Sequence, residues 1–296
     1  MANESTSTTV TEVIERNAYA ESVLYFSERL GLSDFVSKID LSGRSTLTAY
    51  FPIYDKVSAE AIAENTDYTT NQQVDTTGTC SVTVSEHIFK ATLTDLSVDA
   101  TVDDLSGGEG SIPGRMAAET LQRRQDQDIA ALFSAFNSST GSNSGAITTT
   151  LLINAIAQLD IDNVPRDMRV TVLHPFQWKT LLPSFDDAAV YGPQGQTVVT
   201  TGLLGSIYGS EVFVTSNVAT ATVSSSTVYA GAVMHPSAVA LATKGAMPKF
   251  EVERDASLRA FELVATGVWG EAEYRGGATT SGRGGAGVYL YSNSTV

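Results

Sequence analysis

The chain has 296 residues, of which 42% are hydrophobic and 17% charged, a balance that suits a folded protein and excludes a disordered one. Its 33 acidic residues outnumber its 18 basic ones, and the resulting net charge of −15 argues against tight nucleic-acid binding, which needs a basic surface. The single cysteine, Cys80, allows no intrachain disulfide and fits a reducing cytoplasm, and the longest apolar run, 228–242, is too short to cross a bilayer.

The N-terminal third predicts a helix followed by a long hairpin. Residues 11–30 place apolar side chains at helical spacing, and Gly31 is a natural end for that helix. Residues 45–55 and 79–94 have strand patterns, which predicts one β-hairpin over 44–92 with a polar, irregular tip. Its large apolar residues are too sparse to form a core, and a two-stranded ribbon alone is only marginally stable in water. We therefore expect the hairpin to rest on something else.

The next segment predicts a short acidic helix. Asp95, Asp99 and Asp103 recur every four residues, so a helix would place them on one face. A metal site and a solvated helix face are both open, and we favour the solvated face because cation sites need ligands that converge from more than one element. The glycine-rich stretch 106–111 lacks the pattern of a phosphate-binding loop and is interpreted as the break before the next helix.

Residues 113–136 predict a long helix with an unusual centre. Pro113 suits its first turn, and apolar residues gather at its two ends. The centre is polar for nearly two turns, and a helix that is polar all round is not packed in an ordinary core. The central residues that we expect to face solvent or another subunit are Arg123, Arg124, Asp126 and Asp128.

Residues 146–247 alternate predicted helices and strands and so predict an α/β unit. In this unit His174 and His235 each precede a proline, where we expect a strand to give way to a helix. Proline favours the first helical position and an extended residue before it, so both pairs are interpreted as helix starts. The C-terminal residues 248–296 return to strand patterns.

The sequence predicts no catalytic, cofactor-binding or metal-binding residue. No G-x-S-x-G, H-E-x-x-H or C-x-x-C pattern occurs. His87, His174, His235 and Cys80 lack the short pairwise spacings of zinc ligands.

Two other functions stay open. The first is a hydrolase on the α/β unit, and its candidate residues would be His174 or His235 with Asp186 or Asp187. The second is a surface adhesin or decoration protein, which would form a small oligomer.

The order of these elements resembles the major capsid proteins of tailed bacteriophages, which have the Hong Kong 97 fold, an α+β fold. The stretches that carry the resemblance are "AEAIAENTDY", "LTDLSVDATVDDL" followed by "AAETLQRRQDQDIAALF", "VTVLHPFQWKTLL", "GLLGSIYGSEVFVTSN" and "VMHPSAVALA". Each is a loose pattern, and their order over residues 13–292 carries the resemblance.

The resemblance implies a layout for the whole chain. The implied parts are an N-terminal arm (1–43), an extended hairpin or E-loop (44–92), a peripheral domain (93–145 and 248–296) with the spine helix 113–136, and an axial α/β domain (146–247). The hairpin would lie over a neighbouring subunit, and axial loops would meet at the centres of hexamers and pentamers.

The resemblance also implies a structural protein and not an enzyme. Its copies would self-assemble in the host cytoplasm into an icosahedral virion shell around double-stranded DNA, which the acidic chain would touch only weakly and non-specifically. The implied partners are the chain itself and a portal protein, with no cofactor and no membrane. Because the chain starts about a dozen residues before the predicted arm helix, we expect a separate scaffolding protein. Lys56 and Lys90 lie in or near the hairpin, but nothing supplies the site for a lysine–asparagine crosslink, so none is predicted.

Overall fold

The computed structural model of the chain describes residues 31–54, 59–67, 76–99, 112–185, 206–245, 247–275 and 285–293. Several of the predictions fall outside these ranges. They concern the helix over 11–30, Asp103, the glycine-rich stretch 106–111, Lys56, Asp186 and Asp187.

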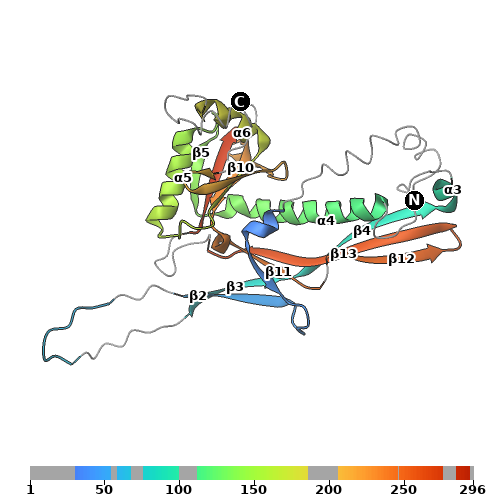
Figure 1. Cartoon of the computed structure of the whole chain (residues 1–296), viewed down its shortest axis with the longest axis horizontal. Coiled ribbons are helices and arrows are strands. Elements are labelled where there is room, and N and C mark those ends of the chain that lie inside the picture. The colour runs from blue at the N-terminus through green and yellow to red at the C-terminus, as the bar shows by residue number, and fades with distance from the viewer. Residues whose placement is uncertain are drawn as a thin grey trace.

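A sheet of seven strands forms the upper part of the molecule in Figure 1. Its strands are β5 (Ser138–Ser142), β6 (Val170–Leu173), β7 (Ser206–Ile207), β8 (Ser210–Val214), β9 (Thr220–Val223), β10 (Ser226–Met234) and β14 (Gly287–Asn293). They lie in the order β5-β14-β10-β6-β8-β7, and β9 pairs with β10. The buried residues of β6 and the inner residues of β10 belong to the main core, which explains their long apolar runs.

Two helices pack around this sheet (Figure 1). Helix α5 (Thr149–Ile161) begins after Thr148, whose hydroxyl accepts a hydrogen bond from the Leu151 N–H at 3.3 Å, and it packs on β5 and β14. Helix α6 (Pro175–Leu181) follows β6 directly and continues as the 3₁₀ turn Leu182–Phe185. These elements confirm the predicted order of helix, strand and helix over 149–185, but the strands β7 to β10 then follow one another up to Met234 without a helix among their described residues.

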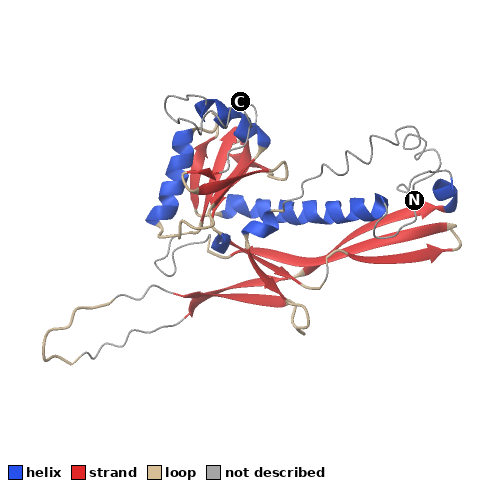
Figure 2. Cartoon of the chain, viewed as in Figure 1, coloured by secondary structure: helices blue, strands red, loops and turns tan. Residues whose placement is uncertain are grey.

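A second sheet of five strands extends along the long axis of the molecule. Its strands are β1 (Ser37–Asp40), β4 (Ser85–Thr94), β11 (Val239–Thr243), β12 (Lys249–Asp255) and β13 (Ala260–Glu273). The order is β1-β11-β13-β12, and β4 pairs with the other edge of β13. Helix α4 (Ile112–Ala131) runs along this sheet in Figure 2 and continues as the 3₁₀ turn Leu132–Ala135, which confirms the predicted long helix.

The extended hairpin is shorter than predicted. It consists of β2 (Thr48–Tyr54) and β3 (Thr76–Thr83), which pair antiparallel. The prediction of one strand over 79–94 is wrong, because the chain leaves the hairpin at Val84 and β4 joins β13 instead. The hairpin over 44–92 therefore ends at Thr83.

The base of the hairpin packs on the second sheet through a small apolar core of its own. This hairpin-base core consists of Leu41, Ala49, Phe51, Val82, Val84, Ala240 and Ala242. The hairpin approaches the backbone of β13 closely at Gly270, where a Cβ atom would lie 2.2 Å from the Thr83 carbonyl oxygen. The expectation that the hairpin rests on something else is confirmed for its base, but the base has more apolar burial than we predicted.

The two large sheets do not follow the predicted segment boundaries. β5 and β14 were assigned to the segments 93–145 and 248–296, yet both belong to the same sheet as β10. Conversely, β11 falls in the segment 146–247 but pairs with β13. The helix expected after His235 is only the 3₁₀ turn Pro236–Ala238, after which β11 begins at once. Long-range strand pairing decides these memberships, and a local pattern carries no information on it.

Candidate self-association surfaces

The two histidines before prolines cap the turns that follow them. The Nδ1 atom of His174 accepts a hydrogen bond from the Phe176 N–H at 3.2 Å, and the Gln177 side chain accepts one from the His174 N–H at 3.1 Å. His235 Nδ1 likewise accepts from the Ser237 N–H at 3.2 Å. Burial lowers the pKa of both histidines. The prediction that a strand gives way to a helix is confirmed at His174, whereas only the 3₁₀ turn Pro236–Ala238 follows His235.

The other two candidate zinc ligands, His87 and Cys80, lie apart, and each contacts a different residue. The His87 ring stacks on Trp269 at a centroid distance of 3.8 Å, and the Cys80 thiol donates to the Glu273 carbonyl at 3.4 Å. Within the described ranges, no group of three or more His, Cys, Asp and Glu side chains could hold a metal ion. No helix in those ranges is both long enough and apolar enough to span a membrane.

Two further charged residues from the prediction are engaged with the second sheet. Asp95 at the start of α3 (Asp95–Asp99) forms an ion pair with Arg254 of β12 at 3.0 Å. Lys90 forms one with Glu262 of β13 at 2.7 Å. The predicted acidic helix face is therefore tied to β12 at its first residue.

The centre of α4 is partly buried, so one prediction about it is wrong. Asp126 is 1% exposed, and its Oδ1 accepts a hydrogen bond from the Leu32 N–H at 2.8 Å. Its Oδ2 accepts from the Asn217 side chain at 3.3 Å. The polar pattern predicts exposed side chains, but a buried carboxylate is tolerated where hydrogen-bond donors satisfy it. Asp126 thus joins three separate segments, and we call Leu32, Asp126 and Asn217 the spine joint.

The other charged residues of this centre behave differently. Arg123 and Arg124 are exposed, as predicted. The prediction is also wrong for Asp128, whose side chain is only 14% exposed. It forms an ion pair with Arg124 at 2.9 Å and accepts from the indole N–H of the buried Trp269 at 3.3 Å. Glu271 of β13 lies near this pair, and burial, together with the Asp128 charge, raises its pKa.

Glu271→Gln is expected to stabilise the unassembled subunit at pH 7. A raised pKa in the folded state means that Glu271 favours folding while protonated, and this contribution is lost as the pH rises through the raised pKa. The gain from glutamine should therefore disappear below about pH 4, the usual range of a Glu pKa. Urea unfolding at pH 7 and below about pH 4 measures the difference in the free energy of unfolding between the variant and the parent. Glu253→Gln, on the exposed face of β12, is the control and should change nothing, whereas a loss of stability in Glu271→Gln at pH 7 would contradict the expectation.

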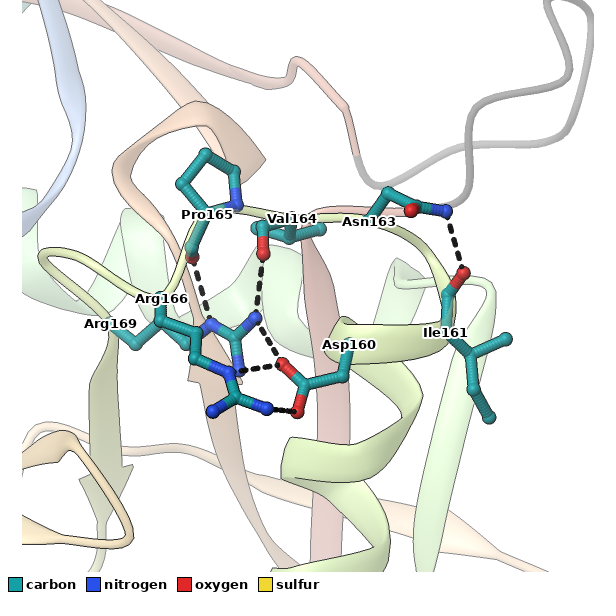
Figure 3. A network of polar contacts seen from close by, with 7 residues as sticks. All are labelled: Asp160, Ile161, Asn163, Val164, Pro165, Arg166 and Arg169. Carbon is teal, nitrogen blue, oxygen red and sulfur yellow. Dashed lines mark hydrogen bonds and ion pairs between the residues drawn. The ribbon is translucent and has the colours of Figure 1, made fainter.

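A buried arginine fixes the loop between α5 and β6 (Figure 3). The Arg169 side chain is 2% exposed, and its guanidinium donates to the carbonyls of Val164 and Pro165 at 2.6 and 2.9 Å. Asp160 pairs with both Arg169 and Arg166, at 2.7 and 2.8 Å. This network could not be predicted from the sequence, because nothing in the pattern separates a buried arginine before a strand from an exposed one.

The tip of the hairpin, residues 59–67, is a fully exposed surface. All residues from 59 to 67 are exposed, and Figure 2 shows the tip far from both large sheets. It carries Glu60, Glu64 and Asp67 together with Ile62, whose exposed fraction is 53%. Nothing in the described part of the chain covers this surface.

Comparisons with protein families and with solved structures show what this chain is similar to. A family described as phage capsid protein matches residues 101–280. Among solved structures, one from Mycobacterium phage Che8 is 17% identical, covers 88% of this chain and 90% of its own, and has a TM-score of 0.64. The capsid of cyanophage P-SCSP1u is 15% identical, with coverage of 89% and 88% and a TM-score of 0.68. The capsid of Ralstonia phage GP4 is 12% identical, with 88% of each chain covered and a TM-score of 0.69. No curated protein matches.

Proposed function

Because this chain belongs to the phage capsid protein family, we propose that its copies form hexamers and pentamers that close into an icosahedral shell around double-stranded DNA. Membership makes the chain a structural subunit of a capsid shell and a component of the virion. The fold matches capsid structures along most of the chain, in agreement with the predicted α+β, Hong Kong 97-like fold. The alternatives, a hydrolase and an adhesin or decoration protein, are not favoured.

We assign the parts of the capsid subunit by sheet. The sheet of β5, β14 and β10 with α5 and α6 would be the axial domain, and the sheet of β13 with the spine helix α4 would be the peripheral domain. The β2–β3 hairpin would be the E-loop, and residues 1–43 the N-terminal arm. The hairpin supports this assignment, since its base is anchored on β13 while its tip extends away from the subunit.

The proposed partners follow from charge and role. A net charge of −15 would keep packaged DNA from adhering to the wall, so contact with it would be weak and non-specific. A separate scaffolding protein and a portal protein would complete assembly in the host cytoplasm. The capping roles of His174 and His235 support a purely structural chain without a catalytic or metal site.

The exposed hairpin tip is the main support for the proposal, because an ordered segment that buries nothing within the described part of its own subunit needs another source of stability. Holding a backbone residue in one conformation costs about 1–2 kcal/mol, and exposed residues gain little burial within the subunit to offset this cost. A neighbouring subunit under the tip would supply that burial. The hairpin-base core would hold β2 and β3 on the second sheet with or without this neighbour.

Replacing residues 59–67 by a short Gly-Ser turn should leave a folded subunit that cannot close a shell. The β2–β3 pairing and the hairpin-base core are untouched by this change, so circular dichroism and urea unfolding should match the parent. Electron microscopy should show no closed shells under conditions in which the parent forms them. The conservative double variant Ile62→Val, Glu64→Asp is the matched control and should assemble. Closed shells of normal size from the shortened chain would refute the proposed role of the tip.

A further inference from the structure

A short turn carries the chain directly from one large sheet to the other. Strand β10 ends at Met234 in the seven-stranded sheet, and β11 begins at Val239 in the five-stranded sheet. Between them lie His235 and the 3₁₀ turn Pro236–Ala238. We call these residues, His235 to Ala238, the sheet joint. Because the joint is so short, its conformation helps to set the angle between the two sheets.

The sheet joint is bound to strand ends in both sheets. The His235 N–H donates to the Ala286 carbonyl, directly before β14 of the seven-stranded sheet, at 2.9 Å. The Ala238 carbonyl accepts from the Tyr274 N–H, directly after β13 of the five-stranded sheet, at 2.8 Å. The joint is therefore the place where the ends of β13 and β14 meet.

The His235 ring caps the joint only in its neutral form. Its Nδ1 atom lies 3.2 Å from the Ser237 backbone nitrogen and 2.8 Å from the Ser237 hydroxyl oxygen. A backbone N–H can only donate, so Nδ1 is unprotonated and accepts from the hydroxyl as well. A proton on Nδ1 would set two N–H groups against each other and remove the cap.

The charged groups around the ring mostly oppose its protonation. The pKa of His235 is lowered first by burial and then by the positive charges of Arg275 and Arg169, whereas the Asp167 charge raises it. The strands β10, β11 and β14 at the joint have no charged residue. On β1, the residue that donates to the joint is the uncharged Ser37, at 2.9 Å.

We propose that the sheet joint is a proton-sensitive hinge, which is fixed while His235 is neutral and released when its ring takes up a proton. The cap stabilises the joint fully above about pH 6.5, the usual His pKa, and its contribution is lost as the pH falls through the lowered pKa of the folded state. The strand pairing of both sheets does not depend on this cap, so acid would free the angle between the sheets without unfolding them. The hinge is a property of the single subunit and goes beyond the proposed shell function.

His174 provides a matched comparison within the same chain. Its Nδ1 caps the Phe176 N–H in the same way, and burial lowers its pKa as well. However, His174 connects β6 to α6 within one sheet and its covering helix, and the Gln177 side chain bonds to its N–H as a second cap. Protonation of His174 should therefore leave the angle between the sheets unchanged.

A histidine titration and a distance between the sheets test the hinge together. NMR of the full-length, unassembled subunit gives the pKa of each of its three histidines. In a Cys80→Ser background, spin labels on Thr222→Cys of β9 and Glu253→Cys of β12, both at exposed positions, report the distance between the sheets by double electron–electron resonance. Between pH 7 and about one pH unit below the measured His235 pKa, the distance distribution should become at least about twice as wide.

Two variants assign this response to His235. His235→Asn places a neutral side-chain oxygen where it can accept from the N–H two residues on at any pH, so its distribution should stay narrow at both pH values. His174→Asn should widen in acid like the parent. A parent distribution that stays narrow, a widening that persists in His235→Asn, or a His235 ring that stays neutral until the subunit unfolds would overturn the hinge. Each of these results would leave the shell function standing, because electron microscopy tests that function separately.

Discussion

Asp126→Ala is expected to lower the free energy of unfolding of the subunit by several kcal/mol. The change removes the acceptor of the Leu32 N–H and of the Asn217 side chain, both in buried surroundings. Each buried donor left without an acceptor costs about 1–3 kcal/mol. Urea unfolding of the unassembled subunit, followed by circular dichroism, measures the loss.

Two variants show whether the spine joint causes this loss. Arg123→Ala lies one turn away on the exposed side of α4 and should change stability by no more than about 0.5 kcal/mol. Asp126→Asn keeps one acceptor for the Leu32 N–H but sets two amide groups against each other at Asn217, so it should lose less than alanine. If Asp126→Ala unfolded at the urea concentration of the parent, the spine joint would contribute nothing to folding.

Gly270→Val should detach the base of the hairpin and prevent assembly. A Cβ atom at this position would lie 2.2 Å from the Thr83 carbonyl oxygen and 3.1 Å from the Val84 Cα. Both are backbone atoms, so no side-chain rotation relieves the clash, and the cost should exceed the about 1–3 kcal/mol of ordinary overpacking. Hydrogen exchange of the β2 and β3 amides should increase, and electron microscopy should show no shells.

Gly78→Ala is the matched control on the same hairpin. The nearest atom to a Cβ there is the Ile53 Cδ1 at 3.9 Å, which is an ordinary contact. This variant should keep both slow exchange and shell formation. Slow exchange in Gly270→Val would mean that β13 and the hairpin can separate slightly without loss of structure.

The local elements could be predicted because each follows from neighbouring residues. The strand patterns over 248–296 correctly indicate the region of β12, β13 and β14 without dividing it, and the polar-centred stretch predicts α4 within about one residue at its start. The assignment of strands to sheets could not be predicted in the same way. β13 pairs with β12 over 260–266 and with β11 over 269–273, and with β4 over 260–269, and only the folded chain decides which partner takes which edge and part.

Polar residues were harder to place than apolar ones. The proline after His174 signals a helix start, so that cap could be predicted from two residues. Asp126 and Arg169 carry no such local signal, because their burial depends on donors and acceptors supplied by other segments. A count of polar residues on a helix therefore treats Asp126 and Arg123 alike, although one is buried and the other exposed.

The continuity of β3 with β4 has a mechanical consequence. The chain passes from the hairpin through Val84 into β4 without a loop, and β4 is in register with β13 from Ser85 to Thr94. A pull on the hairpin tip along the strand direction would load these hydrogen bonds in shear, so that they resist together. A peeling force would break them one after another. The subunit can therefore carry tension through its longest arm at the strength of a whole strand pair.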